Sequence, residues 1–413
     1  MSEGRDPFAA LRYKDYRFYA IALFLSVMGF RMQSVAIGWE LYERTSNAFI
    51  LGLVGLVQVL PVIILTLPAG HVADRYDRKH TVLYTQVMLA LCSVGLAVIS
   101  FRQGSIEWIF ALLFLNGVAR AFSFPANEAL QPQLIPLEVF GNAATWHSSS
   151  FQLASVLGSA LGGLLIAIQN SATTVYITDA VLGLIGFGLI ALITTRSPIR
   201  VKEPPSVRAL LGGIEFVRKN PVIFSAIALD LFAVLLGGAV ALLSIFAKDI
   251  LQVGPVGLGW LRAAPSGGAV LMSAPLAHLP LLKQAGKTLL WSVVGFGVVT
   301  IIFGLSQSFW LSLLMLALSG AFDNVSVVVR RTLVQVWTPD DLRGRVSAVS
   351  SLFISGSNEL GDFESGSVAA LFGPIFAVVS GGIGTIAVVS AIAFFSPQLR
   401  RLGSLQKAEV AHH

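Results

Sequence analysis

Charged residues are scarce in this sequence of 413 residues: aspartate, glutamate, lysine and arginine make up 12% of it, against about 25% in soluble domains. Cysteine is nearly absent, because Cys92 is the only one, which excludes internal disulfides and metal sites built from several cysteines. The sequence contains no P-loop of the form G-x-x-x-x-G-K-[ST] and no H-E-x-x-H zinc motif. We therefore expect neither a soluble enzyme nor a bound cofactor or metal.

Apolar residues, in contrast, are abundant. They make up 55% of the chain, the mean hydropathy is +0.77, and 39 glycines suit close contact between membrane helices. A helix needs about 20 apolar residues to cross a bilayer. Twelve stretches are long enough, and they predict an all-α membrane protein: 18–41, 48–70, 81–101, 108–127, 141–168, 173–195, 221–247, 256–277, 287–306, 309–331, 346–371 and 374–396.

The positive charges predict the orientation, because lysine and arginine gather on the cytoplasmic side of a membrane. With both termini cytoplasmic, 22 of the 28 cations fall in cytoplasmic segments, and the segment 330–345 is one of these. We therefore expect a multi-pass protein of the bacterial inner membrane. Anionic lipid explains such flanking cations better than nucleic acid does, so no nucleic-acid partner is expected.

The chain divides into two similar halves. A polar segment at 196–219, with a short amphipathic helix at 207–217, separates bundles of six spans at 1–195 and 220–396, and 397–413 forms a cytoplasmic tail. Five residues recur at an offset of 203, which indicates a duplication. An even number of spans in each half makes the repeats parallel. The pairs are Pro136 and Pro339, Gly141 and Gly344, Leu157 and Leu360, Gly158 and Gly361, and Gly163 and Gly366.

The loop after the second span carries a recognisable signature. It reads Gly70-His71-Val72-Ala73-Asp74-Arg75-Tyr76-Asp77-Arg78-Lys79. This run resembles the G-x-x-x-D-R-x-G-R-[RK] signature of the major facilitator superfamily, although Asp77 stands where the family has its second glycine. The resemblance implies two six-helix bundles that rock around a central cavity, and it implies a gating role for Gly70, Asp74, Arg75 and Arg78.

Two further features resemble the same superfamily. Arg120 in span 4 is similar to an arginine of the family's span-4 motif. Gly158 and Gly162 lie in a run similar to an antiporter motif, with Ser159 in place of its proline. Packing of small residues explains the glycines equally well. The segments 8–19, 38–42 and 65–78 look like the branch that contains the enterobactin exporter and related multidrug exporters.

Span 11 is unusual in carrying three carboxylates, Glu359, Asp362 and Glu364. Ionisable groups at bilayer depth face a cavity or a partner, so each is a functional candidate. At about 100° per residue, Glu359 and Asp362 lie about 60° apart on one face of a helix, whereas Glu364 lies about 140° from Glu359. Clustering and burial both favour proton uptake by carboxyl groups. Together with Asp230, Glu359 and Asp362 are therefore our candidates for proton coupling.

The remaining intramembrane polar residues are candidates for substrate binding. They are Arg31, Asp230, Arg262, Asp323, Asn358 and Glu364. An alternative is a structural network in which the span-11 acids neutralise Arg31 or Arg262. For Asp230, we consider a position facing the cavity and pairing with a neighbouring helix equally. Asp179, at the end of span 6, is expected to be solvated or paired locally.

We therefore expect a secondary transporter and not an enzyme. The favoured hypothesis is proton-coupled export of amphipathic organic molecules, such as drugs or a siderophore, by a monomer in contact with lipid. Import, metal-cation export by the same fold, and lipid scrambling or flipping are the alternatives.

Overall fold

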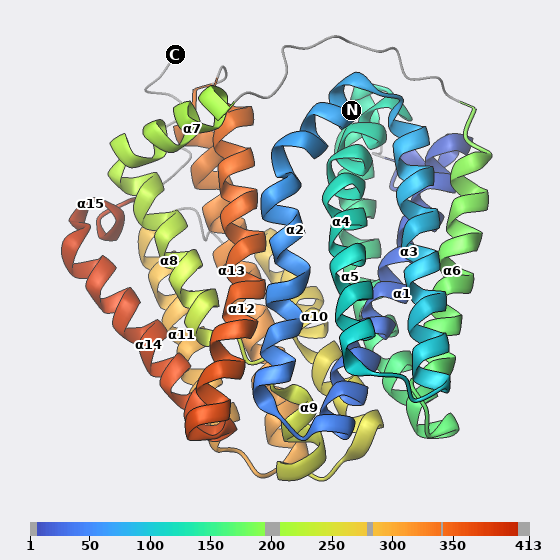
Figure 1. Ribbon diagram of the computed structural model, residues 1–413. Helices are drawn as coiled ribbons and strands as arrows, with labels where there is room; N and C mark the ends of the chain where they lie inside the picture. The colour runs from blue at the N-terminus through green and yellow to red at the C-terminus, as the bar shows by residue number, and fades with distance from the viewer. Residues whose placement is uncertain (1–5, 195–206, 279–283, 340–341, 404–413) are drawn as a thin grey trace. The chain divides into compact units, whose positions relative to one another are not determined.

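The computed structural model describes residues 6–194, 207–278, 284–339 and 342–403, and these are nearly all helical (Figure 1). Local signals set several helix ends. Asn220 caps α8 by accepting hydrogen bonds from the backbone N–H groups of Val222 and Ile223, both at 3.2 Å. Gly373, with φ of 91°, turns the chain between α13 and α14, where Pro374 begins the next helix.

The helices have the following bounds: α1 Lys14–Thr45, α2 Ala48–Arg75, α3 Arg78–Phe101, α4 Ile106–Leu130, α5 Phe140–Gln169, α6 Thr173–Ala191, α7 Val207–Lys219, α8 Pro221–Gly237, α9 Leu243–Ile245, α10 Gly254–His278, α11 Ala285–Leu305, α12 Phe309–Trp337, α13 Arg343–Phe372, α14 Pro374–Phe395 and α15 Pro397–Arg400. A π-helical turn at Phe246–Ile250 follows α9.

Nine helices within the described ranges are long and apolar enough to cross a membrane. A tenth is counted if the pair Gly212–Lys219 and Pro221–Gly237, bent by 104°, is taken as one span. The prediction of a multi-pass helical protein is thus confirmed. The predicted spans 256–277 and 346–371 lie within α10 and α13, whereas α8 covers only the first part of 221–247. Twelve spans and cytoplasmic termini stay predictions. The short helix expected at 207–217 is confirmed as α7.

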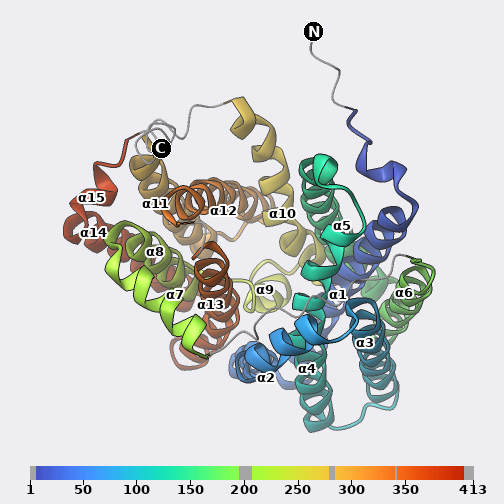
Figure 2. The ribbon, with the colours of Figure 1, turned by 90° about the horizontal axis from the view of Figure 1, so that it is seen from above.

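The chain divides into two compact units. Unit 1 is Met1–Glu40 with Leu60–Pro205, and unit 2 is Leu41–Val59 with Ser206–His413. Their packing follows one plan: α3 packs on α4 and α6 in unit 1, and α11 packs on α12 and α14 in unit 2 (Figure 2). Helices α5 and α13 are both 30 residues long and begin at the offset of 203. Common neighbours and spacing support the duplication inferred from the sequence.

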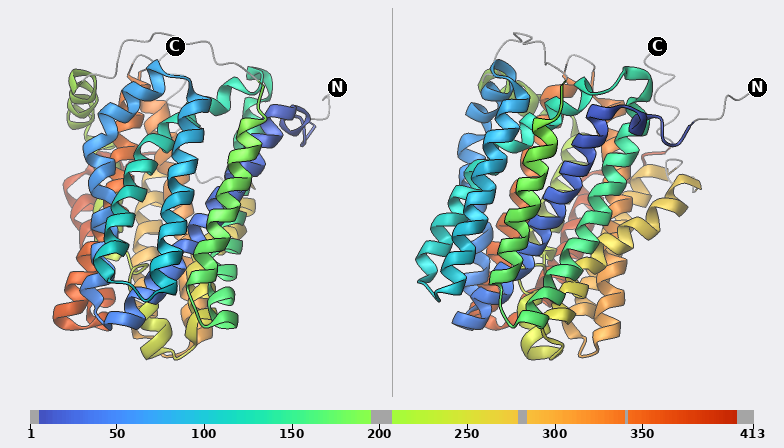
Figure 3. Two further views of the ribbon diagram at one scale, coloured as in Figure 1. Left: turned by 45° about the vertical axis from the view of Figure 1, so that its right-hand side comes forward. Right: turned by 90° about the vertical axis from the view of Figure 1, so that its right-hand side faces the viewer.

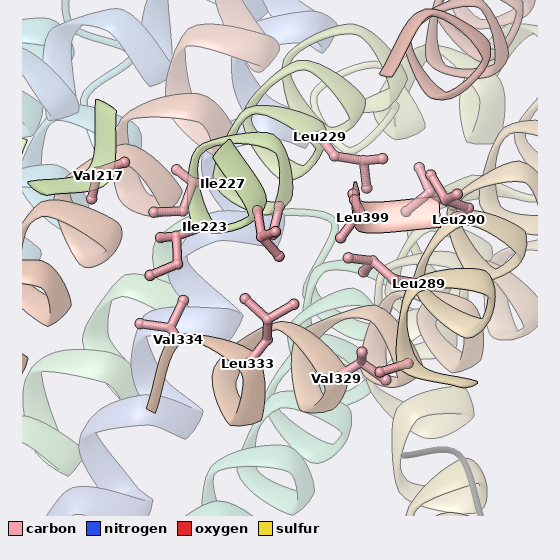
Figure 4. Close-up of a cluster of buried hydrophobic side chains, with 14 of the residues drawn as sticks. Val217, Ile223, Ile227, Leu229, Leu289, Leu290, Val329, Leu333, Val334 and Leu399 are labelled. Atoms are coloured by element: carbon pink, nitrogen blue, oxygen red, sulfur yellow. The ribbon is translucent and has the colours of Figure 1, made fainter. Parts of the chain in front are cut away.

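Each unit has an apolar core of its own. In unit 1 a buried cluster near the start of α1 includes Tyr16, Tyr19 and Leu130, and the helices of this unit run side by side (Figure 3). Figure 4 shows the corresponding cluster of unit 2, which fixes α7 and α15 to the ends of longer helices. Its labelled members are Val217, Ile223, Ile227, Leu229, Leu289, Leu290, Val329, Leu333, Val334 and Leu399.

The predicted seventh span, 221–247, is wrong as one helix. Helix α8 ends at Gly237, and Gly238 adopts an extended conformation with ψ of 100°. The chain then passes through turns to α9 and the π-helical turn. A non-helical segment at membrane depth is tolerated only where protein groups bind its backbone. The side chains that do so come from α13.

Candidate functional site

Unit 2 contains a small cavity between α8, α11 and α12, which two carboxylates face although most of its wall is apolar. Asp230 and Asp323 face it together with Ser292 and Ser326, while Phe296 and Phe322 supply apolar walls. The interior volume of this cavity is only about 10 Å³, about enough for one water molecule. Two carboxylates that the sequence singled out separately, on spans 7 and 10, therefore share one site.

A buried ion pair joins the same helices. Arg330 of α12 pairs with Asp230 of α8, and the two residues are only 2% and 6% exposed. The charges of Asp230, Arg330 and Arg331 also act on Asp323. Removing one partner of such a pair leaves an uncompensated buried charge, which is strongly destabilising.

The placement of Arg330 corrects the sequence analysis, which counted it among the cytoplasmic cations. Helix α12 continues to Trp337, almost two turns beyond Arg330, so this side chain enters the bundle. Its neighbour Arg331 is exposed. Successive residues of a helix point about 100° apart, and hydropathy alone does not tell which of two adjacent arginines faces inward.

Helix α13 binds the free backbone of the break after α8. Asp362 Oδ1 accepts a hydrogen bond from the backbone N–H of Ala241 at 3.2 Å. Ser365 Oγ donates to the carbonyl oxygen of Gly238 at 2.8 Å. Because neither backbone group has a helical partner there, these contacts remove the cost of leaving it unsatisfied. Asp362 thus has a structural role that span periodicity did not reveal.

The charged groups near Asp362 include two that the sequence predicted, Glu359 and Arg262. Glu359, on the same face of α13, and Arg262 of α10 both act on the Asp362 carboxyl. Arg262 is therefore the cation near this acid in unit 2. The predicted ion pair of Arg31 with these acids stays a prediction, because Arg31 belongs to unit 1.

The two other polar candidates on α13 have local partners. Glu364 Oε2 accepts a hydrogen bond of 3.3 Å from Ser365, and Asn358 Nδ2 donates to the carbonyl oxygen of Ile354 at 2.8 Å. Asn358 is exposed, whereas Glu364 is partly buried. Their predicted roles in substrate binding stay predictions.

Unit 1 contains a contrasting group of cations and aromatic rings. The guanidinium of Arg120 lies 4.2 Å from the ring centroid of Phe30, and that of Arg31 lies 5.6 Å from Phe151. Arg31 Nε also donates to Ser155 Oγ at 3.3 Å. Guanidinium groups over aromatic faces are attractive to anionic and flat ligands. The sequence singled out both arginines but not their ring partners.

Gly158 and Gly162 pack α5 against α1. A Cβ atom at Gly162 would lie 3.0 Å from Met32 Cα, and one at Gly158 would lie 2.9 Å from Arg31 Cβ. A larger residue at either position would force its neighbours in α1 to shift. The packing interpretation is therefore supported, and the gating role of both glycines stays a prediction.

The loop between α2 and α3 has an ordered structure without the family's second glycine. Asp77 has φ of −63° and caps α3, accepting from the backbone N–H of Lys79 at 2.8 Å. Lys79 Nζ donates to the carbonyl oxygens of Ala191 and Ile193, at 2.9 and 2.6 Å, at the end of α6. The loop thus ties three helices of unit 1 together.

The four predicted gating residues lie on either side of this loop, in α2 and at the first residue of α3. Gly70 is in the last two turns of α2, Arg75 is its exposed final residue, and Arg78 Nε donates to the carbonyl oxygen of Ala73 at 3.2 Å. The side chain of Asp74 lies outside the described part of the structure. Their function in gating is a prediction that these contacts do not test.

Comparison with known proteins places this architecture among transporters. A family model described as transmembrane secretion effector matches residues 5–413. The enterobactin exporter EntS of Shigella boydii serotype 4 (strain Sb227) and that of Escherichia coli O1:K1 / APEC are each 25% identical over 390 residues, which is 94% of this chain and 92% of theirs.

Solved structures share the fold at low identity. The nucleoside transporter NupG aligns with a TM-score of 0.73 at 14% identity, covering 92% of this chain and 100% of that one. A bacterial homologue of the human lysosomal transporter Spinster, inward-facing and occupied, aligns with a TM-score of 0.70 at 14% identity, covering 96% and 98%. These two likenesses concern the fold alone.

Proposed function

Because this chain belongs to the transmembrane secretion effector family of the major facilitator superfamily, we propose that it exports a small organic molecule by secondary transport coupled to protons. As a member of this family it is a multi-pass membrane transporter and not an enzyme. Export of an organic molecule is supported by its relatives that are named enterobactin exporters. Their substrate is not transferred to this chain, for which we propose amphipathic organic molecules as the cargo.

Proton coupling is supported above all by the buried Arg330–Asp230 ion pair, which lies beside a small cavity that Asp323 also faces. A proton taken up by Asp230 from outside neutralises the carboxylate and releases a hydrogen-bond-donating group of the substrate held by it. Release of that proton to the cytoplasm restores the carboxylate and its ion pair with Arg330, so that the next substrate molecule can bind in exchange. Asp323 faces the same cavity and supplies a second carboxyl along the route of the proton.

Glu359 and Asp362 are the proposed continuation of the proton route in α13. They act on each other electrostatically and lie beside Arg262. Since Asp362 also binds the backbone of the α8 break, a change in its protonation would alter that hydrogen bond. We therefore propose that Glu359 transfers the proton. Asp362 would couple its own protonation state to the shape of α8.

The transport cycle that we propose is alternating access. Two six-span bundles, 1–195 and 220–396, would rock against each other as rigid bodies joined by the linker 196–219. The protein would be a monomer of the bacterial inner membrane, with both termini and the tail 397–413 in the cytoplasm. Arg31 and Arg120, with their aromatic neighbours, would bind the substrate and help to gate it. Gly70, Asp74, Arg75, Arg78, Gly158 and Gly162 would control the switch.

Proteoliposomes with an imposed pH gradient test this function. An amphipathic fluorescent dye should move against its own gradient in vesicles with the native protein, with counterflow of protons reported by a trapped pH indicator. Glu359→Gln and Asp230→Asn should abolish the gradient-driven part. Glu215→Gln is the matched control, because Glu215 is an exposed carboxylate on α7 that pairs with Lys219 at 2.7 Å.

The same vesicles separate the alternatives. If the native protein transports the dye at the same rate with and without a pH gradient, proton coupling is rejected. Accumulation in the opposite direction would indicate import, gradient-driven movement of a divalent cation would indicate a metal exporter, and fluorescent-lipid movement without a gradient would indicate a scramblase.

A further inference from the structure

A hydrogen-bonded network in unit 1 surrounds the carboxyl of Asp179 on α6. Ser93 Oγ of α3 donates to Asp179 Oδ2 at 2.6 Å, and Gln33 Nε2 of α1 donates to the same oxygen at 3.0 Å. Asn116 Nδ2 of α4 donates to Gln33 Oε1 at 3.4 Å. Helices α1, α3 and α6 therefore meet at one acid, and α4 joins them through Gln33. The sequence predicted instead that Asp179 is solvated or paired locally.

This acid differs from Asp230 in having no cation beside it. Among the described residues, no lysine, arginine or histidine lies within 4.0 Å of the Asp179 carboxyl. The groups that face it are neutral: Gly29 and Gln33 from α1 and Ser93 from α3, with Asn116 of α4 behind Gln33. A carboxylate at bilayer depth without a counter-charge costs several kcal/mol.

The network is also short of one hydrogen. Both donors point at Oδ2, and no described residue donates to Asp179 Oδ1, which lies against the backbone of α1 at Gly29. Asn116 Oδ1 is buried and accepts no hydrogen bond within the described structure. A proton bound at Asp179 Oδ1, the oxygen that receives neither donor, removes the uncompensated charge.

The direction of the donors distinguishes a proton from a metal ion. Ser93 and Gln33 turn hydrogens, not lone pairs, toward the carboxylate. A bound metal cation needs several oxygen lone pairs directed at one point, and this arrangement does not offer them.

We propose that Asp179 is a proton-binding site of unit 1, separate from the carboxyls of unit 2, and that Gln33 transmits its protonation state to α1. When the carboxyl is ionised, it holds the hydrogens of Gln33 and Ser93. When it is protonated, it binds them less strongly and can donate a hydrogen bond of its own. Since Gln33 lies on the same helix as Arg31, the network connects a proton site to the arginine–aromatic group.

The experiment is an infrared pH titration of the purified full-length protein without substrate, so its outcome is independent of the proposed export. The native spectrum minus that of Asp179→Asn should contain a carboxylic-acid C=O band that is lost between about pH 5 and pH 9, a window above the usual range of aspartate. Asp15→Asn is the control: Asp15 accepts from the backbone N–H of Thr194 at 3.1 Å in an exposed position, and its removal should not change this band.

Ser93→Ala keeps the carboxyl and removes one donor to its ionised form. The band should then persist to higher pH than in the native protein. The proposal is overturned if the native and Asp179→Asn spectra show the same carboxylic-acid bands across this window. It is also overturned if the Asp179 band does not change with pH, or if Ser93→Ala leaves its midpoint where it was.

Discussion

Helices α5 and α13 are equivalent in the two repeats, yet they meet the first helix of their units in different ways. Gly158 of α5 and Gly361 of α13 occupy the same position counted from the start of the helix, and both permit close approach: a Cβ at Gly361 would lie 2.9 Å from the carbonyl oxygen of Val234 in α8. In unit 1 the partner α1 is continuous past this contact, whereas α8 ends at Gly237.

The positions that follow account for the difference. Ser159 and Gly162 of α5 correspond to Asp362 and Ser365 of α13. Because α1 satisfies its own backbone there, small side chains are sufficient in α5. Because α8 is broken, α13 supplies an acceptor and a donor to the released N–H and C=O groups. Part of the charge in unit 2 is thus explained by backbone geometry, independently of transport.

A second contrast concerns charge at equivalent positions. Arg120 of α4 and Asp323 of α12 are equally far from the first residue of their helices. The first lies over the Phe30 ring, and the second faces a cavity beside an ion pair. The duplicated helices have therefore diverged into an arginine–aromatic group in one unit and a carboxylate group in the other.

The greatest loss of stability is expected from the buried ion pair of unit 2. Arg330→Met leaves Asp230 buried without its cation and should lower the free energy of unfolding by about 3–5 kcal/mol. Denaturant titration in mixed micelles measures this. The double variant Asp230→Leu with Arg330→Met should recover most of the loss, and a double variant no more stable than the single one would contradict the argument.

The next effect tests the helix break. Asp362→Ala removes the acceptor of the Ala241 N–H and should cost about 2 kcal/mol of unfolding free energy. Asp362→Asn keeps a carbonyl oxygen at that place and should cost clearly less. Hydrogen exchange of the Ala241 amide provides a local measurement: equal exchange rates in the two variants would show that Asp362 does not hold the break.

A smaller effect is expected where α5 packs on α1. Gly162→Ala places a Cβ 3.0 Å from Met32 Cα, and the overpacking should cost about 1 kcal/mol. Gly141→Ala is the matched control in the same helix, since no atom lies within 4 Å of a Cβ there. The melting temperature should fall for the first variant only, and equal melting temperatures would remove the close-packing explanation.

The least change in stability is expected at Ser159, the position of α5 that is equivalent to Asp362 of α13. Ser159→Ala alters the residue of α5 that corresponds to Asp362, but α1 has no break for it to bind. Its unfolding free energy should change by less than about 0.5 kcal/mol. If it were as destabilising as Asp362→Ala, the different roles of the two equivalent positions would be refuted.

The sequence predicted those parts of the site that depend on local pattern. The 100° rotation per residue placed Glu359 and Asp362 on one face, and their mutual interaction agrees with it. Hydropathy identified Asp230 and Asp323 as misplaced charges. The same measure failed for Arg330, because it stands next to an exposed arginine near the expected end of a span. It also failed for the break after Gly237, since the residues beyond it are as apolar as a helix.

A helical, multi-pass membrane protein with two similar halves follows from the amino-acid sequence. Scarcity of charge, length of apolar runs and residue spacing are properties of the chain alone, and the bilayer selects helices for such runs. The partners of the buried charges become known from the packed helices: Arg330 for Asp230, the α8 backbone for Asp362, and Ser93 and Gln33 for Asp179. These partners are distant along the chain, and hydrogen bonds and ion pairs depend on separations of a few ångströms, which packing alone sets.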